Sequence, residues 1–202
     1  MFLEEEIEFP RKDDKLFIDD GPVIYKAWLH KSFQQFGTYA TSYGYAAKYL
    51  IDSIVLREEQ DGKDFLVYPI VFLIRHYVEL RLKELIQGLN YCNSQNYGFP
   101  SHHRIDNMWG EFKRQYREIG EKDDDDEFKA MDQIIKELSG SDPISMHFRY
   151  PVDKAGNLTQ IHDYICIKNL RSTFKRLSML LDGLSDQIDH YKDITRSLMD
   201  DA

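Results

Sequence analysis

Apolar residues recur at helical spacing along much of the chain, and the clearest run lies between Tyr68 and Ile86. Within it, one apolar stripe steps by three and four residues, and a second stripe widens the apolar face. A helix that is apolar on more than one side must be packed on more than one side, so we expect it at the centre of a bundle. Pro69 falls in its expected first turn, where proline is tolerated. The stripes consist of Val71, Ile74, Val78, Leu82 and Leu85, and of Ile70, Leu73, Tyr77 and Leu80.

The same periodicity predicts helices on both sides of this central one. A long helical region begins near Val23 and continues to Val55, although Gly37 and Gly44 allow a break into two helices. Ser101 is the expected N-cap of the next helix. The last two helices predicted by the pattern span Phe128–Leu138 and run from about Asp163 into the 190s.

One segment departs from the helical pattern. HFRYPVDKAGNLTQ (147–160) alternates polar and apolar residues around a turn-forming DKAGN, which is typical of an extended segment or small hairpin. Residues 1–22 are charged and end in DDGP, a turn signal. We therefore predict an acidic arm over residues 1–22 and one all-α domain over residues 23–202. That domain is an antiparallel bundle of five to seven helices with a small extended or hairpin insertion near residues 147–160.

Composition and charge exclude several classes of protein. A chain of 202 residues with 42% hydrophobic content suits one packed domain, and its net charge of −9 argues against a globally basic nucleic-acid binder. Cys92 and Cys166 are too few for a disulfide framework, which favours a reducing compartment. The acidic amino terminus does not resemble a signal peptide, and the longest near-apolar run, Val67–Ile74, is far below the roughly 20 residues that span a bilayer. We expect a cytoplasmic protein without membrane contact.

The central helix also carries a polar cluster of Arg75, His76, Glu79 and Lys83. Because side chains three and four residues apart meet on a helix, Glu79 is in reach of the other three. One interpretation is a ladder of exposed ion pairs, each worth about 0.3–0.5 kcal/mol. The other is a cleft in which Glu79 orients His76 or Arg75 toward a phosphate or a proton. Spacing alone favours the ladder.

Two further segments supply candidate residues for such a cleft. His103 is placed to reach back and hydrogen-bond Glu79 across two packed helices. Arg149, in the predicted extended segment, either pairs with an acidic side chain or presents its guanidinium to a phosphate. No HExxH-type pattern supports a metal site, and no Walker loop, GxSxG or Gly-rich dinucleotide motif supports a cofactor. We therefore predict neither a metal nor a cofactor.

The order of these pieces resembles the HEPN superfamily. RHYVELRLKELI is followed by HRIDNMW and later by a long Leu-rich final helix, over roughly Phe65 to Ile188. The most specific parts are ExxxK at Glu79 and Lys83, and HxIxxMW from His103 to Trp109. RYPxDxxG, from residue 149 to 156, is similar to a feature of a bacterial subgroup. The resemblance implies a compact helical bundle that commonly dimerises, found in toxin RNases, in partners of minimal nucleotidyltransferases, and in phage-defence and abortive-infection systems.

One departure from the family matters for function. Its active RNases resemble one another in an RxxxxH-type motif near the start of the last helix. Here Arg171 is followed at the corresponding positions by Arg176, Leu177 and Ser178, and none of the seven histidines lies at that distance after any arginine. The RNase site of the family therefore does not carry over. Only Glu79, Lys83, His103 and Trp109 transfer, as fold residues and cleft candidates.

We expect an atypical HEPN-like accessory factor, a homodimer in bacterial defence or stress response, with RNA, a nucleotide or another protein as its partner. Two alternatives stay open. One is a metal-independent ribonuclease with a rearranged site, in which a histidine is the general base and an arginine stabilises the developing charge. The other is a non-enzymatic dimerising interaction module. The sequence leaves open whether the protein is an enzyme. The residues expected to bind phosphate are Arg75, His76, Glu79, Lys83, His103 and Arg149.

Overall fold

The computed structural model describes residues 9–29, 35–56, 62–94 and 97–200. The chain divides into two units, Met1–Ser32 and Phe33–Ala202, so the boundary lies beyond the predicted residue 22. In the described part of the first unit, one 3₁₀ turn, η1 (Val23–Tyr25), stands at the start of the predicted helical region, so the prediction is wrong for residues 23–29, whereas from Phe36 onward the region is helical as predicted. Trp28 is 79% exposed, and the neighbouring apolar side chains are exposed as well. Helical spacing by itself does little to stabilise a short helix in water.

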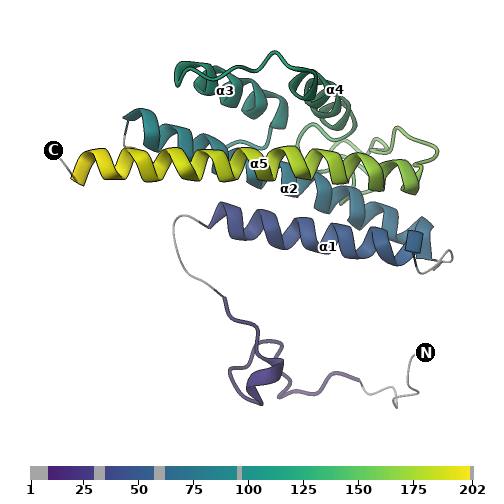
Figure 1. Ribbon diagram of the computed structural model, residues 1–202. Helices are drawn as coiled ribbons and strands as arrows, with labels where there is room; N and C mark the ends of the chain where they lie inside the picture. Colours follow the sequence, from purple (N-terminus) through teal and green to yellow (C-terminus); the bar gives the residue numbers. More distant parts are fainter. Residues whose placement is uncertain (1–8, 30–34, 57–61, 95–96, 201–202) are drawn as a thin grey trace. The chain divides into compact units, whose positions relative to one another are not determined.

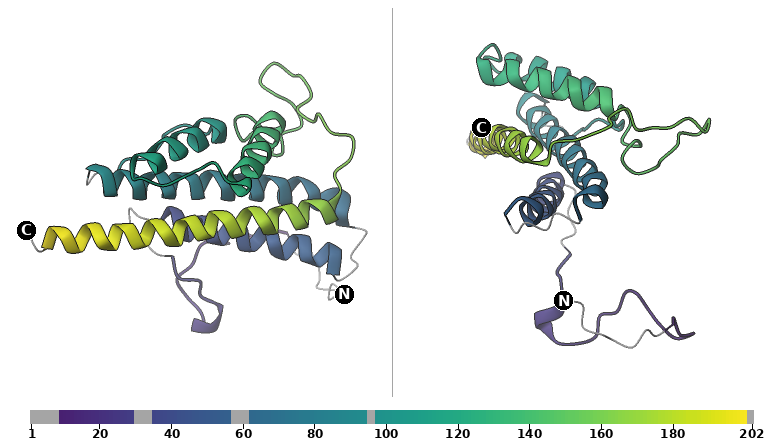
Figure 2. Two further views of the ribbon diagram at one scale, coloured as in Figure 1. Left: turned by 45° about the horizontal axis from the view of Figure 1, so that its top comes forward. Right: turned by 90° about the vertical axis from the view of Figure 1, so that its right-hand side faces the viewer.

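Five α-helices form the described part of the second unit, which confirms the predicted all-α class. The central helix, α2, packs against α1, α3 and α5. Figures 1 and 2 show α1 on one side of the α2/α5 pair and α3 and α4 on the other. In Figure 1, α1 runs in the opposite direction to α2 and α5. The helices are α1 (Phe36–Leu56), α2 (Lys63–Ser94), α3 (Ile105–Glu118), α4 (Asp126–Ser141) and α5 (Ile167–Asp200).

Helix α2 extends beyond its predicted span at both ends, so Pro69 lies inside it rather than in its first turn. A proline inside a helix deprives the carbonyl four residues earlier of its donor. That carbonyl belongs to Phe65, and both residues are exposed, so the carbonyl is open to solvent and the missing bond costs little. The apolar stripes of α2 are buried as predicted except at Leu73, which is half-buried, and Ile70, Val78, Leu82 and Leu85 are fully enclosed.

Two glycines let neighbouring helices approach α2 closely. A Cβ at Gly44 of α1 would lie 2.8 Å from the ring of Tyr77, and a Cβ at Gly88 of α2 would lie 2.4 Å from the Cγ2 of Ile188 on α5. Real side chains do not tolerate contacts that short, so both positions require glycine at this helix spacing. The break allowed by glycine in α1 does not occur, because α1 is continuous from Phe36 to Leu56.

Helices α3 and α4 pack through stacked aromatic rings, among them Trp109 on Phe128 at 5.4 Å. Helix α4 begins after Asp125, whose carboxylate caps the Phe128 amide at 2.8 Å. It continues to Ser141, past the predicted end at Leu138. Two bonds extend it, because Ser141 Oγ donates to the carbonyl of Glu137 and the Asp142 amide donates to that of Leu138.

The segment between α4 and α5 contains the predicted small hairpin. An isolated antiparallel bridge joins Val152 to Leu158, and Asp153 binds the turn amides of Ala155 and Asn157. Helix α5 begins at Ile167, a few residues after its predicted start. Among the described helices, none is both long and apolar enough to cross a membrane.

Candidate functional site

Arg75 and Glu79 form a buried ion pair on α2. The Nη1 atom of Arg75 donates to the Oε2 atom of Glu79 at 2.8 Å, and the two residues are 0% and 2% exposed. Lys83, one turn further along, is buried too and donates to Oε1 of the same carboxylate at 3.0 Å. The interpretation of this cluster as a ladder of exposed ion pairs is therefore wrong.

His103 completes the set of groups around this carboxylate. Its Nδ1 atom lies 2.7 Å from Glu79 Oε1, which confirms the predicted contact, while its side chain is 62% exposed. An ionised carboxylate only accepts hydrogen bonds, so Nδ1 carries the proton and donates. The opposite ring nitrogen, Nε2, has no partner among the residues that the structure describes.

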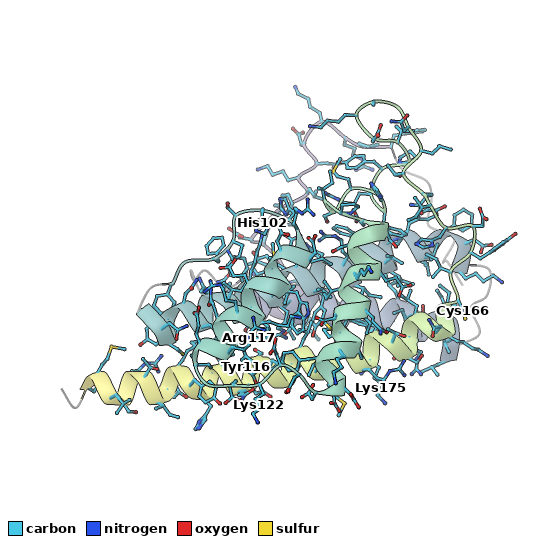
Figure 3. All side chains as sticks on the ribbon, turned by 90° about the horizontal axis from the view of Figure 1, so that it is seen from above. His102, Tyr116, Arg117, Lys122, Cys166 and Lys175 are labelled. Atoms are coloured by element: carbon cyan, nitrogen blue, oxygen red, sulfur yellow. The ribbon has the colours of Figure 1, made fainter. Side chains whose placement is uncertain are left out.

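The backbone of His103 is held as firmly as its ring. Arg75 Nη2 donates to the His103 carbonyl at 2.5 Å, which fixes this residue in the segment before α3 rather than on the helix. The predicted N-cap at Ser101 is therefore wrong, because α3 begins at Ile105 and is preceded by Arg104, which makes no side-chain capping bond. Figure 3 labels His102, the neighbour of His103, ahead of α3, and Tyr116 and Arg117 toward its other end.

Asp142, which the sequence did not suggest, is the third anchor of Arg75. The Nε atom of Arg75 donates to the Asp142 carbonyl at 3.0 Å, and Asp142 is fully buried. Its Oδ1 atom accepts from the amides of Met146 and His147, while Oδ2 lies 3.8 Å from Arg75 Nε without a hydrogen bond. One guanidinium thus joins α2, the entry to α3 and the exit from α4. Asp142 lies just past the predicted helix end at Leu138, and no local pattern in the sequence marks this role.

Two buried cations and two buried carboxylates balance in this cluster. Burial alone would raise the pKa of Glu79, but hydrogen bonds from His103 and Lys83, together with the charges of Lys83 and Arg75, hold it below its ordinary value. The carboxylate therefore stays ionised, and the exposed imidazole is the one group of the cluster that offers an unpartnered polar atom to solvent. We call Glu79 with His103 the Glu79–His103 pair.

Two predicted site residues, His76 and Arg149, lie apart from this pair. The His76 ring stacks on Phe72 at 5.6 Å and meets the edge of Tyr43 from α1 at 4.4 Å. Burial lowers the pKa of His76, opposed by Glu79 and reinforced by neighbouring cations. Arg149 covers the same Phe72 ring at 5.5 Å and donates Nε to the Ser145 carbonyl at 2.5 Å. Both are held by packing, without a direct contact to Glu79 among the described residues.

Four cavities in the described part of the chain are lined by residues other than the predicted site residues. What the cluster presents to a ligand is an exposed imidazole on a rigid base. Its Nε2 atom can accept a proton when the ring is neutral and donate to an anion when the ring is charged. The described residues also hold no group of three or more His, Cys, Asp or Glu side chains suited to a metal ion.

Comparison with known proteins adds no assignment. No family model matches the chain, and no match is found among curated proteins or among solved structures.

Proposed function

We propose that this chain is an atypical HEPN-like accessory factor that binds RNA through its phosphates, with His103 as the central contact. The single observation that carries the proposal is an exposed imidazole whose ring is fixed by a buried carboxylate and whose Nε2 atom is unpartnered. The resemblance adds the setting, which is a homodimer in bacterial defence or stress response. That setting is part of the proposal.

The chemistry around His103 suits a phosphate. When the ring carries its second proton, Nε2–H donates to a phosphate oxygen, and Glu79 stabilises the positive ring from the other side. Residues 101–104 read Ser-His-His-Arg and are exposed. They lead directly to the amino end of α3, where the N-cap residue makes no side-chain capping bond and the helix dipole favours an anion. The Asp106 carboxylate in the first turn binds backbone amides there and competes with an external anion.

The rigidity of the base explains why so much charge is buried beneath one exposed ring. Arg75 holds the His103 carbonyl while Glu79 holds the His103 ring, so the imidazole is fixed at two points. A contact group that is already oriented loses less freedom on binding, which improves affinity without adding contact area. Lys83 keeps the carboxylate ionised and in place.

The same observation favours a second candidate function, a metal-independent ribonuclease. A neutral His103 oriented by Glu79 is a suitable general base. In that reaction Nε2 takes the proton of an RNA 2′-hydroxyl, the 2′-oxygen bonds to the adjacent phosphorus, and the bond to the 5′-oxygen breaks. A second acid must supply the proton for the leaving oxygen, and no partner for this role contacts His103 among the described residues. We therefore place binding ahead of cleavage.

The experiment measures binding of a fluorescent single-stranded RNA by anisotropy at low salt. The variant is His103→Gln, and the matched control is His190→Gln, which removes an exposed histidine from α5. Loss of one charge-assisted hydrogen bond predicts roughly tenfold weaker binding for His103→Gln and no change for the control. Equal affinity of both variants, or no binding by the parent protein, contradicts the proposal. If the parent protein cleaves the RNA in the presence of EDTA and the His103→Gln variant does not, the result supports the ribonuclease instead.

A further inference from the structure

A polar cavity of about 440 Å³ lies between α1, the second half of α2 and the middle of α5. It is separate from the Glu79–His103 pair, because neither member of the pair and no residue of α3 is in its lining. Its charged lining side chains are four carboxylates and two cations: Glu84, Asp182, Asp186, Asp189, Arg81 and Lys192.

Arg81 forms the base of this cavity and orients two of the carboxylates. Its Nη1 atom donates to Glu84 at 2.5 Å and its Nη2 atom donates to Asp182 at 2.8 Å. Tyr77 donates to the same Asp182 oxygen at 2.7 Å. With both cations paired, since Lys192 binds Asp189 at 2.7 Å, the lining keeps an excess of negative charge.

Asp186 carries part of that excess. It lines the cavity and has no hydrogen-bond or ion-pair partner among the described residues. Burial raises the pKa of Glu84, and the nearby charge of Asp189 adds to this effect, although Arg81 opposes it. Glu84 is thus a half-buried carboxylate that gains stability from an additional cation.

A neutral acceptor reinforces the acidic groups. Gln87 is only 6% exposed and lines the cavity, and its Nε2 atom donates to the Tyr97 carbonyl at 3.0 Å. Its Oε1 atom accepts no hydrogen bond from any described residue and remains accessible to solvent. The amide oxygen of a buried side chain that is open to the cavity and has no protein partner is available to accept a hydrogen bond from a ligand.

The acceptors are arranged in a row. Asp182, Asp186 and Asp189 follow one face of α5, and seven residues at 1.5 Å rise per residue place the ends of the row about 10 Å apart. Arg81 and Lys192 already pair with Asp182 and Asp189 at its two ends, so the acceptors left for a ligand are Asp186 on α5, and Glu84 and the Gln87 oxygen on α2. A chain with several ammonium groups can neutralise carboxylates on both helices and donate to the amide oxygen as well.

We propose that this cavity binds a linear aliphatic polyamine, with ammonium groups at Asp186 and Glu84 and a hydrogen bond to Gln87. The Arg81 ion pairs hold the carboxylates in position, and Gly37 leaves room for Glu84, since a Cβ there would lie 2.1 Å from its Oε1 atom. The site is selective for the spacing of positive charges along a flexible chain.

Isothermal titration of the full chain with spermidine tests the proposal. Saturable binding of one spermidine per chain is expected, with putrescine weaker and butylamine weaker again. Asp186→Asn removes one charge-assisted hydrogen bond and is expected to weaken spermidine binding about tenfold. The matched control, Asp193→Asn, removes the same charge from α5 outside the cavity and is expected to leave affinity within about twofold.

The proposal is overturned by absence of binding, by equal losses in Asp186→Asn and Asp193→Asn, or by butylamine binding as tightly as spermidine. Displacement of spermidine by magnesium at equal concentration overturns it too, because the cavity would then respond to charge alone. Asp186 is exposed and unpartnered, so the Asn variant is expected to fold. A rise in melting temperature of the parent protein with spermidine, and not with butylamine, gives a test that needs no variant.

Discussion

Removal of Glu79 is the perturbation with the clearest expected magnitude. Its carboxylate accepts from Arg75 at 2.8 Å, Lys83 at 3.0 Å and His103 at 2.7 Å. Glu79→Ala leaves Arg75 and Lys83 buried with one fewer counter-charge. Removing one partner of a buried ion pair costs about 3–5 kcal/mol, because the remaining charge stays desolvated. A domain of this size is stable by about 5–15 kcal/mol, so the loss is a large share of the total.

Urea denaturation followed by circular dichroism measures this loss by linear extrapolation. The matched control is Glu118→Ala, which breaks an i,i+4 pair with Arg114 on α3, where both side chains are more than half exposed. That pair is expected to contribute less than about 1 kcal/mol. Combining Glu79→Ala with Arg75→Ala is expected to cost at least about 1 kcal/mol less than the sum of the single variants, since the two residues interact. If Glu79→Ala and Glu118→Ala lose the same stability, the buried cluster does not hold the fold as described.

Three further predictions use other parts of the molecule. The pKa of Glu79 is lowered in the fold, so the stability contributed by its carboxylate is present above the ordinary pKa of 4.5 and is lost as the pH falls through the lower folded pKa. The difference in stability between the parent protein and Glu79→Gln should therefore shrink over that pH range. A difference that stays constant would contradict this prediction. Burial is the main reason that the pKa of His76 is lowered, so the stability of the fold declines as the pH falls below 6.5, where the unfolded chain takes up a proton more readily. His76→Phe should reduce the loss of stability measured between pH 7.5 and 5.5. An unchanged loss would contradict this prediction. Gly88→Ala should destabilise the fold by about 1–3 kcal/mol through the contact with Ile188. Gly183→Ala, on the open face of α5, should instead stabilise it by up to about 1 kcal/mol. Thermal melts compare the two variants, and equal effects would show that α5 does not pack as described.

Hydrophobic periodicity predicted the helices that have a packing partner. Helix α2 is apolar on more than one side, and this pattern occurs only in a buried helix, so its central place followed from sequence. Residues 23–29 have apolar residues at similar spacing, yet they form a single 3₁₀ turn, while the same predicted region forms α1 from Phe36 onward. The pattern records side-chain positions, and spacing alone does not decide whether a helix forms.

The Glu79–His103 contact was predictable because two local patterns coincided, an acid on the inner helix and a histidine ahead of the next one. The burial of Arg75 was not predictable, since hydrophobic periodicity places charged residues on the solvent side unless their partners are known. Asp142 lies 67 residues from Arg75 in the chain, and no spacing rule links them. The cavity carboxylates of α5 could likewise not be recognised as a group from the sequence, because the cavity forms only where α2 lies beside α5.

The most direct test of the central claim is a titration of ¹⁵N-histidine-labelled protein with a short single-stranded RNA, observed through the imidazole nitrogen resonances. The account predicts that Nε2 of His103 shifts first and saturably, while Nδ1 keeps the signature of its bond to Glu79 and the resonances of His190 stay in place. The opposite result, with His103 unmoved while RNA binds elsewhere, would remove the phosphate contact from this site.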